Sequence, residues 1–190
     1  KEEHFYMMIL DLDEFSSVNK LYNHQFGDAV LAKTAQLIQS ILPEQARLYR
    51  NDGDEFIILF RDCVDSRDIS ECYQRLQKEL DHQRVLNGKK YHCTVSAGCA
   101  DFPKDATDMM ALTKNAGYAL DASKRNGKNR LTFYEKKMSE TKLQELDMLE
   151  QLRYCMEHEF EGFQLQYQPQ VEAESGRIIG AEALARWHSS

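Results

Sequence analysis

The pattern of apolar and polar residues predicts alternating strands and helices over the first 135 residues. Residues 6–11 are apolar up to the final aspartate, as in a strand buried on both faces. Apolar positions at helical spacing predict a short helix over 15–22 and a longer helix that opens at Asp28 and ends before Pro43. The same reasoning predicts four later elements: a helix over 66–83, a strand over 91–100, a helix over 107–124 and a strand over 131–134.

A hairpin is predicted between these elements, because residues 47–51 and 54–60 flank the pair Asp52-Gly53. Such a pair supplies the positive φ angles of a two-residue type I′ turn. A tight hairpin excludes a purely parallel sheet. The order of elements therefore predicts an α+β fold, an α/β sandwich with a ferredoxin-like βαββαβ core.

The pattern changes after this core. Residues 138–160 predict a long acidic helix whose leucines, Leu143, Leu146, Leu149 and Leu152, form one stripe with Met156. Residues 164–171 and 177–187 predict two strands, too few for a core of their own. We expect three parts, a domain at 1–137, a connector helix at 138–162 and the start of an incomplete second domain at 163–190, in a piece of a longer protein.

Composition narrows the function classes. With 24 Lys and Arg against 31 Asp and Glu, the formal charge of −7 argues against a general binder of nucleic acid or anionic membrane. Every apolar run is far shorter than the roughly 20 residues that span a bilayer, so we expect no membrane segment in these residues. Five cysteines without a Cys-x-x-Cys pair favour a reducing cytoplasm, which is compatible with an anchor elsewhere in the parent protein.

Carboxylates gather at the ends of the two most apolar strands, as Asp11-Leu12-Asp13 and as Asp52-Gly53-Asp54-Glu55. Paired strands can bring the two groups together, and hard oxygen ligands suit Mg²⁺, which completes its shell with phosphate oxygens and water. The chemistry indicated is phosphoryl or nucleotidyl transfer. From spacing alone, the alternative is that acidic residues gather where strands meet turns.

The hairpin sequence Asn-Asp-Gly-Asp-Glu-Phe at 51–56 resembles the signature of the GGDEF family of diguanylate cyclases, with Asp52 in place of its first glycine. Other segments match the family's order and spacing: 11–15, Val18-Asn19, His24, Gly27-Asp28, 95–98, 116–124 and 125–130. The resemblance covers about residues 5–135. It implies a nucleotidyl-cyclase-like core with a mainly antiparallel sheet.

The resemblance also implies a GTP site with Mg²⁺ or Mn²⁺. The metal ligands it implies are Asp11, the Leu12 backbone carbonyl and Asp54, and Glu55 is a further ligand or base. Asp54 and Glu55 are thus the implied catalytic residues.

The nucleotide contacts implied by the resemblance come from several segments. Asn19 and Asp28 match the guanine-binding positions, and a carboxylate suits the donors of that base. Asp52 and Gly53 would lie beside the nucleotide, and Lys124 and Lys128 match the phosphate-binding pair. The alternatives are helix capping by Asp28, a solvated Asn19, and two lysines that act as ordinary cations near a helix C-terminus.

Asp52 puts catalysis in doubt, because it adds a negative charge where the family has glycine. We therefore expect weak or no cyclase activity and a regulatory GTP-binding and Mg²⁺-binding module for an attached phosphodiesterase. One alternative is an active diguanylate cyclase, which makes cyclic di-GMP from two GTP in a homodimer. Another is a dimerisation scaffold with an empty site.

Residues 167–169 and 180–187 resemble the opening of the EAL domain, the cyclic di-GMP phosphodiesterase. By that resemblance Glu182 is a metal ligand, and Gln168, Leu184 and Arg186 touch substrate. Cyclic di-GMP is then a ligand of the parent protein. We expect these 190 residues alone not to hydrolyse it, because the other ligands of such a domain lie beyond Ser190.

Overall fold

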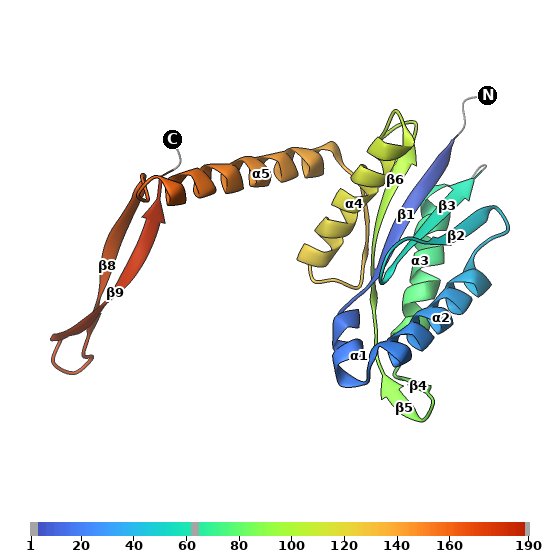
Figure 1. The fold of residues 1–190 in the computed structure, drawn as a ribbon, viewed down its shortest axis with the longest axis horizontal. Coiled ribbons are helices and arrows are strands. Elements are labelled where there is room, and N and C mark those ends of the chain that lie inside the picture. The colour runs from blue at the N-terminus through green and yellow to red at the C-terminus, as the bar shows by residue number, and fades with distance from the viewer. Residues whose placement is uncertain (1–3, 62–64, 189–190) are drawn as a thin grey trace. The chain divides into compact units, whose positions relative to one another are not determined.

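The computed structural model describes residues 4–61 and 65–188 (Figure 1). Its elements follow the predicted alternation and are, in chain order, β1 (Phe5–Leu12), α1 (Phe15–Leu21), α2 (His24–Ile41), β2 (Ala46–Arg50), β3 (Glu55–Arg61), α3 (Ser66–Leu80), β4 (Arg84–Leu86), β5 (Lys89–Tyr91), β6 (Val95–Phe102), α4 (Met109–Arg125), β7 (Leu131–Phe133), α5 (Lys136–Glu157), β8 (Phe163–Val171) and β9 (Ile178–Trp187).

A five-stranded sheet in the order β2-β3-β1-β6-β7 forms the centre of the first part of the chain. Strand β1 pairs antiparallel with both β3 and β6, and only β6 and β7 run parallel. This arrangement confirms the predicted α+β class with a mainly antiparallel sheet. It also places the C-terminal end of β1 beside the start of β3, where the two predicted carboxylate groups lie.

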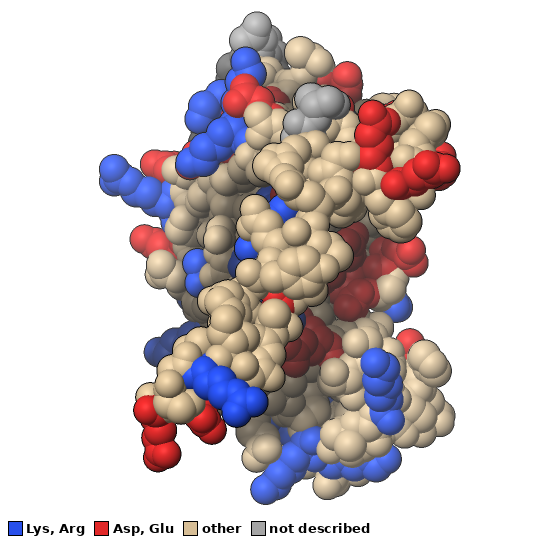
Figure 2. Space-filling view, turned by 90° about the vertical axis from the view of Figure 1, so that its left-hand side faces the viewer, with Lys and Arg blue, Asp and Glu red and all other residues tan. Residues whose placement is uncertain are grey.

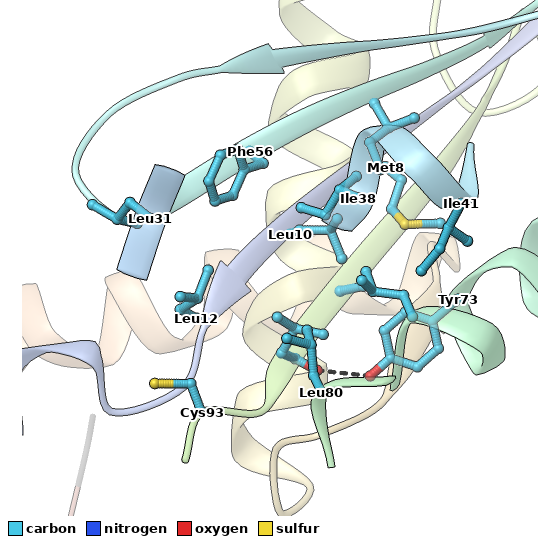
Figure 3. Packing of buried hydrophobic residues seen from close by; sticks show 14 of the residues in the cluster. Met8, Leu10, Leu12, Leu31, Ile38, Ile41, Phe56, Tyr73, Leu80 and Cys93 are labelled. Carbon is cyan, nitrogen blue, oxygen red and sulfur yellow. Dashed lines mark hydrogen bonds between the residues drawn. The ribbon is translucent and has the colours of Figure 1, made fainter. Parts of the chain in front are cut away.

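Both faces of the sheet are buried, which explains the unbroken apolar run in β1. Alternate residues Met8 and Leu10 join the core under α2 and α3, and Met7 and Ile9 join a second cluster under α4. Figure 1 shows α4 on one face of the sheet and α2 and α3 on the other. In the larger cluster, the buried Tyr73 hydroxyl donates to the Val95 carbonyl at 2.7 Å (Figure 3).

The predicted helix over 66–83 ends at Leu80, and the predicted helix over 138–160 runs from Lys136 to Glu157. Two larger differences concern α2 and β6. The long helix starts at His24 and not at Asp28, because the Asn23 side chain caps it by accepting the Phe26 amide at 2.9 Å. The predicted strand over 91–100 is interrupted, because Tyr91 pairs with Arg84 in a small hairpin whereas β6 pairs with β1. The chain changes partner between β5 and β6, and the β4-β5 hairpin was not predicted.

The β2-β3 hairpin is present, but its predicted two-residue type I′ turn is wrong. The Asn51 amide donates to the Glu55 carbonyl at 3.0 Å, so three residues, 52–54, form the loop. Only Gly53 in this loop has a positive φ, +52°, whereas a type I′ turn needs two such residues. Asp52 thus keeps an ordinary backbone conformation.

The structure divides into two compact units, residues 1–139 and 140–190, and the boundary falls within α5. In the second unit β8 and β9 pair antiparallel over nearly their whole length. The predicted leucine stripe on α5 is wrong, because a helix turns by about 100° per residue and Leu143 and Leu152 therefore lie on opposite sides. Leu143, Leu146 and Leu149 are all exposed.

The surface carries charges of both signs. On the face shown in Figure 2, lysine and arginine side chains are interspersed with acidic ones. Among the described residues, no helix has the length and apolar character that crossing a membrane demands.

Candidate functional site

The pairing of β1 with β3 brings the two carboxylate groups together. Asp11 lies opposite Glu55 in the strand register, and the Leu12 amide donates to the Asp54 carbonyl at 3.3 Å. Asp11 is buried, whereas Asp54 and Glu55 are partly exposed. The hairpin therefore delivers two solvent-accessible carboxylates next to a buried one.

Lys124, in the last turn of α4, reaches this cluster. Its ammonium lies 2.7 Å from Asp11 Oδ2, and the two side chains are 36% and 11% exposed. Burial raises the pKa of Asp11 above its ordinary value of 3.8, with a smaller contribution in the same direction from Asp54, and the bond to Lys124 opposes the shift. The Asp11 carboxylate is thus poorly solvated and depends on a cation.

The donor set suits a hard divalent ion. Asp11, Asp54 and Glu55 offer carboxylate oxygens at one end of β1, and Mg²⁺ commonly takes only one or two carboxylates beside water and phosphate oxygens. Within the described ranges, no three or more His, Cys, Asp or Glu side chains are grouped so that they could hold a metal ion. At Asp11 the cation present is the ammonium of Lys124.

Lys128 lies in the loop that follows the end of α4 at Arg125. Its ammonium contacts Glu14 Oε1 at 3.0 Å. This hydrogen bond raises the pKa of Lys128, and the charges of Glu14, Asp13 and Asp11 act in the same direction. Both candidate phosphate-binding lysines are thus paired with carboxylates at the end of β1.

Asp13, the third acidic residue of the first group, faces the protein interior. It is 7% exposed and accepts hydrogen bonds from the Ser96 hydroxyl at 2.6 Å, the Thr94 hydroxyl at 2.7 Å and the Asn129 amide at 3.1 Å. Spacing alone could not separate it from Asp11, because its partners lie more than 80 residues away in the sequence.

Asp28 lies within α2 and is exposed, so the capping alternative for it is wrong. It lines a cavity of about 210 Å³ together with apolar residues and one cation, namely Leu31, Ala32, Ala35, Leu48, Phe56 and Arg50. This volume is below the roughly 300–1,000 Å³ of sites that take a whole small-molecule ligand. No sequence pattern indicated Arg50, whose guanidinium also donates to the Gly53 carbonyl at 3.1 Å.

Asn19 lies close to α2 but does not line that cavity. Its Oδ1 is buried, has no hydrogen-bond partner among the described residues, and would be 2.0 Å from a Cβ on Gly27. Glycine at 27 is therefore what allows the Asn19 side chain to pack against the start of α2, one residue from Asp28. The structure brings Asn19 and Asp28 near one another, with the Asn19 oxygen turned into the protein.

Asp52 and Gly53 are exposed in the hairpin loop. No atom lies within 4 Å of a Cβ placed on Gly53, so the space beside this turn is open. The Asp52 carboxylate lies in solvent beside this open space.

The four residues matched to the EAL domain share one face of the β8-β9 hairpin. Gln168 is opposite Glu182 in the register, and Leu184 and Arg186 follow at two-residue spacing on β9. All but Leu184 are exposed.

The chain matches one known protein family over most of its length. The family described as "Diguanylate cyclase, GGDEF domain" matches residues 1–130. The chain belongs to this GGDEF family. The matched range contains Asp11, Asp28, residues 52–55 and both lysines of the site.

Relatives of this GGDEF chain include much longer proteins. It is 33% identical over 181 residues to the cyclic di-GMP phosphodiesterase NbdA of Pseudomonas aeruginosa, covering 95% of this chain and 23% of that protein. It is 31% identical over 186 residues to the bifunctional diguanylate cyclase/cyclic di-GMP phosphodiesterase MucR of the same organism, covering 98% and 27%. The chain thus spans about a quarter of the length of these relatives.

Solved structures agree with the fold. An EAL/GGDEF domain protein from M. capsulatus is 29% identical, with a TM-score of 0.65 over 70% of this chain and 86% of that one. The GGDEF domain of DgcB from Caulobacter crescentus, in complex with c-di-GMP, is 27% identical, with a TM-score of 0.60 over 69% and 78%. The chain therefore carries a GGDEF domain of the kind found in cyclic di-GMP signalling proteins.

Proposed function

We propose that residues 1–137 form a GTP-binding and Mg²⁺-binding regulatory module in a composite cyclic di-GMP signalling protein. The observation that carries this proposal is the meeting of Asp11, the hairpin carboxylates and Lys124 at one end of β1. Carboxylates for a cation beside lysines for phosphates are the complementary charges that a metal-bound triphosphate needs.

In this proposal Asp11, Asp54, Glu55 and the Leu12 carbonyl supply metal ligands once the side chains turn toward the ion, because the described carboxylates are not grouped closely enough to hold it as they lie. The ion then screens the triphosphate from the carboxylates. Asp28 accepts hydrogen bonds from guanine at the cavity that it lines, and Asn19 lies near Asp28, against Gly27. Lys124 and Lys128 leave their carboxylate partners to bind phosphates.

Asp52 favours regulation over synthesis. At about 6 Å from a phosphate charge, its carboxylate costs about 3 kcal/mol at an effective dielectric of 20 and about 0.7 kcal/mol in bulk water. Because Asp52 is exposed, its cost lies between these limits. That range corresponds to a factor of about 3 to about 100, in GTP affinity where it acts on binding and in the rate of synthesis where it acts on the transition state alone.

The second part of the proposal concerns residues 138–190. We assign 138–162 to a connector, which is helical up to Glu157, and 163–190 to the start of an EAL phosphodiesterase domain. Gln168, Glu182, Leu184 and Arg186 share one face of that second segment. Occupancy of the GTP site would then regulate that domain. The chain's similarity to NbdA, itself named a cyclic di-GMP phosphodiesterase, supports this arrangement.

Product analysis tests regulation against synthesis. The full parent protein and its Asp52→Gly variant are incubated with GTP and Mg²⁺, and nucleotides are separated by chromatography. We expect little cyclic di-GMP from the wild type and about tenfold more from Asp52→Gly, which corresponds to about 1.4 kcal/mol. Equal and rapid synthesis by both proteins would replace the regulatory function with that of an active diguanylate cyclase, which works as a homodimer.

A further inference from the structure

The loop that carries Lys128 has an unusual backbone. Gly127, Lys128 and Asn129 have φ angles of +104°, +60° and +47°, so three consecutive residues adopt the left-handed region. Lysine and asparagine reach this region only at a cost in conformational energy, and they stay there when the surrounding structure holds them. The contacts of this loop therefore decide where Lys128 points.

Two side chains hold the loop at Asn129, one on each side of that residue. The Asn129 amide donates to Asp13 Oδ2 at 3.1 Å, and the Asn129 carbonyl accepts from Gln77 Nε2 at 2.6 Å. Gln77 belongs to α3 and Asp13 follows β1 directly, so two separate elements fix one residue. The preceding Lys128 amide donates to the Ser123 carbonyl at 3.1 Å, which fixes the loop to the end of α4.

Asp13 is itself fixed. Hydroxyls from Thr94 and Ser96 donate to its two carboxylate oxygens, and its own amide donates to the Thr94 carbonyl at 2.9 Å. A buried carboxylate with all these donors has no freedom to serve as a metal ligand. Its position next to Glu14, the partner of Lys128, couples the loop to the end of β1 that carries the site.

We propose that Asp13 and Gln77 are positioning residues, which hold the Asn129 peptide so that the Lys128 ammonium faces the phosphate side of the site. This inference rests on the proposed GTP-binding function. Neither residue touches the nucleotide in this proposal, and both act through Lys128. The competing explanation is that Asp13 only joins β1 to β6.

A double-mutant cycle in the full chain separates the two explanations. Affinities for GTP and GMP with Mg²⁺ are measured by calorimetry for the wild type, Asp13→Asn, Lys128→Ala and the double variant. Asp13→Asn keeps the size of the side chain and removes the negative charge of the carboxylate that accepts a hydrogen bond from the Asn129 amide. We expect GTP affinity to fall about fivefold, GMP affinity to change little, and the effect to vanish in the Lys128→Ala background.

Gln77→Ala provides a second route to the same loop without disturbing a buried charge. It should also lower the affinity for GTP, by a smaller factor than Asp13→Asn does. Asn129→Gly is the matched control, because glycine keeps the amide donor and accepts the positive φ, and it should bind GTP like the wild type.

The outcomes are distinguishable. If the wild type binds no GTP with Mg²⁺, the proposed function and this inference both fall. If the wild type binds GTP but the effects of Asp13→Asn and Lys128→Ala simply add, or GTP and GMP weaken equally, only the positioning role is overturned. Faster exchange of the Asn129 amide hydrogen in Asp13→Asn and in Gln77→Ala, with unchanged exchange in the core strands, supports the proposed role, and unchanged exchange at Asn129 contradicts it.

Discussion

Replacing Lys124 by methionine removes the ammonium that lies 2.7 Å from Asp11 but keeps the length and apolar stem of the side chain. The Asp11 carboxylate, 11% exposed, then loses its charged partner. Hydrogen bonds to charged groups contribute about 1.5–3 kcal/mol, and the one-third exposure of Lys124 lets water replace part of that. We therefore expect Lys124→Met to lower the free energy of unfolding by about 2 kcal/mol at neutral pH.

The pH dependence of this loss of stability provides a second test of the interaction between Lys124 and Asp11. Burial already raises the pKa of Asp11, and Lys124 opposes that shift, so the variant should raise the pKa further. A carboxyl group whose pKa is higher in the folded than in the unfolded state stabilises the folded state at any pH below its unfolded-state pKa, ordinarily 3.8. This contribution is lost as the pH rises through the folded-state pKa. The stability deficit of Lys124→Met should therefore shrink when the protein is acidified.

Urea unfolding at neutral and acidic pH, with and without Mg²⁺, measures these effects. Mg²⁺ should stabilise the variant more than the wild type, because the Lys124 ammonium no longer neutralises Asp11. Lys128→Met is the matched control, because its ion pair with Glu14 is exposed and should matter little for stability. A deficit that is the same at both pH values, or equal in the control, would refute the assignment of Asp11 as a buried carboxylate that depends on a cation.

Two further predictions concern the loop and the core. Glu14→Gln frees the Lys128 ammonium from its partner at 3.0 Å, so calorimetry should show GTP affinity rising about two- to threefold with Mg²⁺, and a fall in affinity would contradict competition between Glu14 and phosphate. Gly98→Ala should lower unfolding stability by about 3 kcal/mol or more, because its Cβ would lie 2.1 Å from the Leu120 amide nitrogen and 2.2 Å from the Ala116 carbonyl oxygen. Gly117 lies on α4, and a Cβ there meets no atom within 4 Å, so Gly117→Ala should raise the free energy of unfolding by about 0.5–1 kcal/mol. Equal urea midpoints for the two variants would contradict the close packing of α4 on β6.

The fold was predictable where one residue pattern fixed one element. The apolar run of β1 and the helical spacing of α3 and α4 led to the right elements in the right order. The start of α2 was missed because Asn23 and Asp28 are both good caps, and only the contact of Asn23 with the Phe26 amide distinguishes them. The break before β6 was missed because a change of strand partner leaves no trace in hydrophobic periodicity.

The meeting of the candidate carboxylates was predictable, and the partners of the other candidate residues were less so. Asp11, Asp54 and Glu55 follow from the ends of apolar strands, since strand pairing gathers such ends. The partners of Lys124 and Asp13 come from contacts across more than 80 residues, which no local pattern reveals. Arg50 was overlooked because its neighbours in the sequence give no sign of the cavity that it shares with Asp28.

Calorimetric titration of the chain with GTP tests the central claim most directly. With Mg²⁺ present, we expect saturable binding of one GTP per chain, weaker binding of ATP, and loss of binding when a chelator removes the metal. Asp28→Ala should narrow the preference for GTP over ATP, because it removes the carboxylate at the mouth of the cavity. Absence of GTP binding with Mg²⁺, or binding of equal affinity with chelator, would contradict the account.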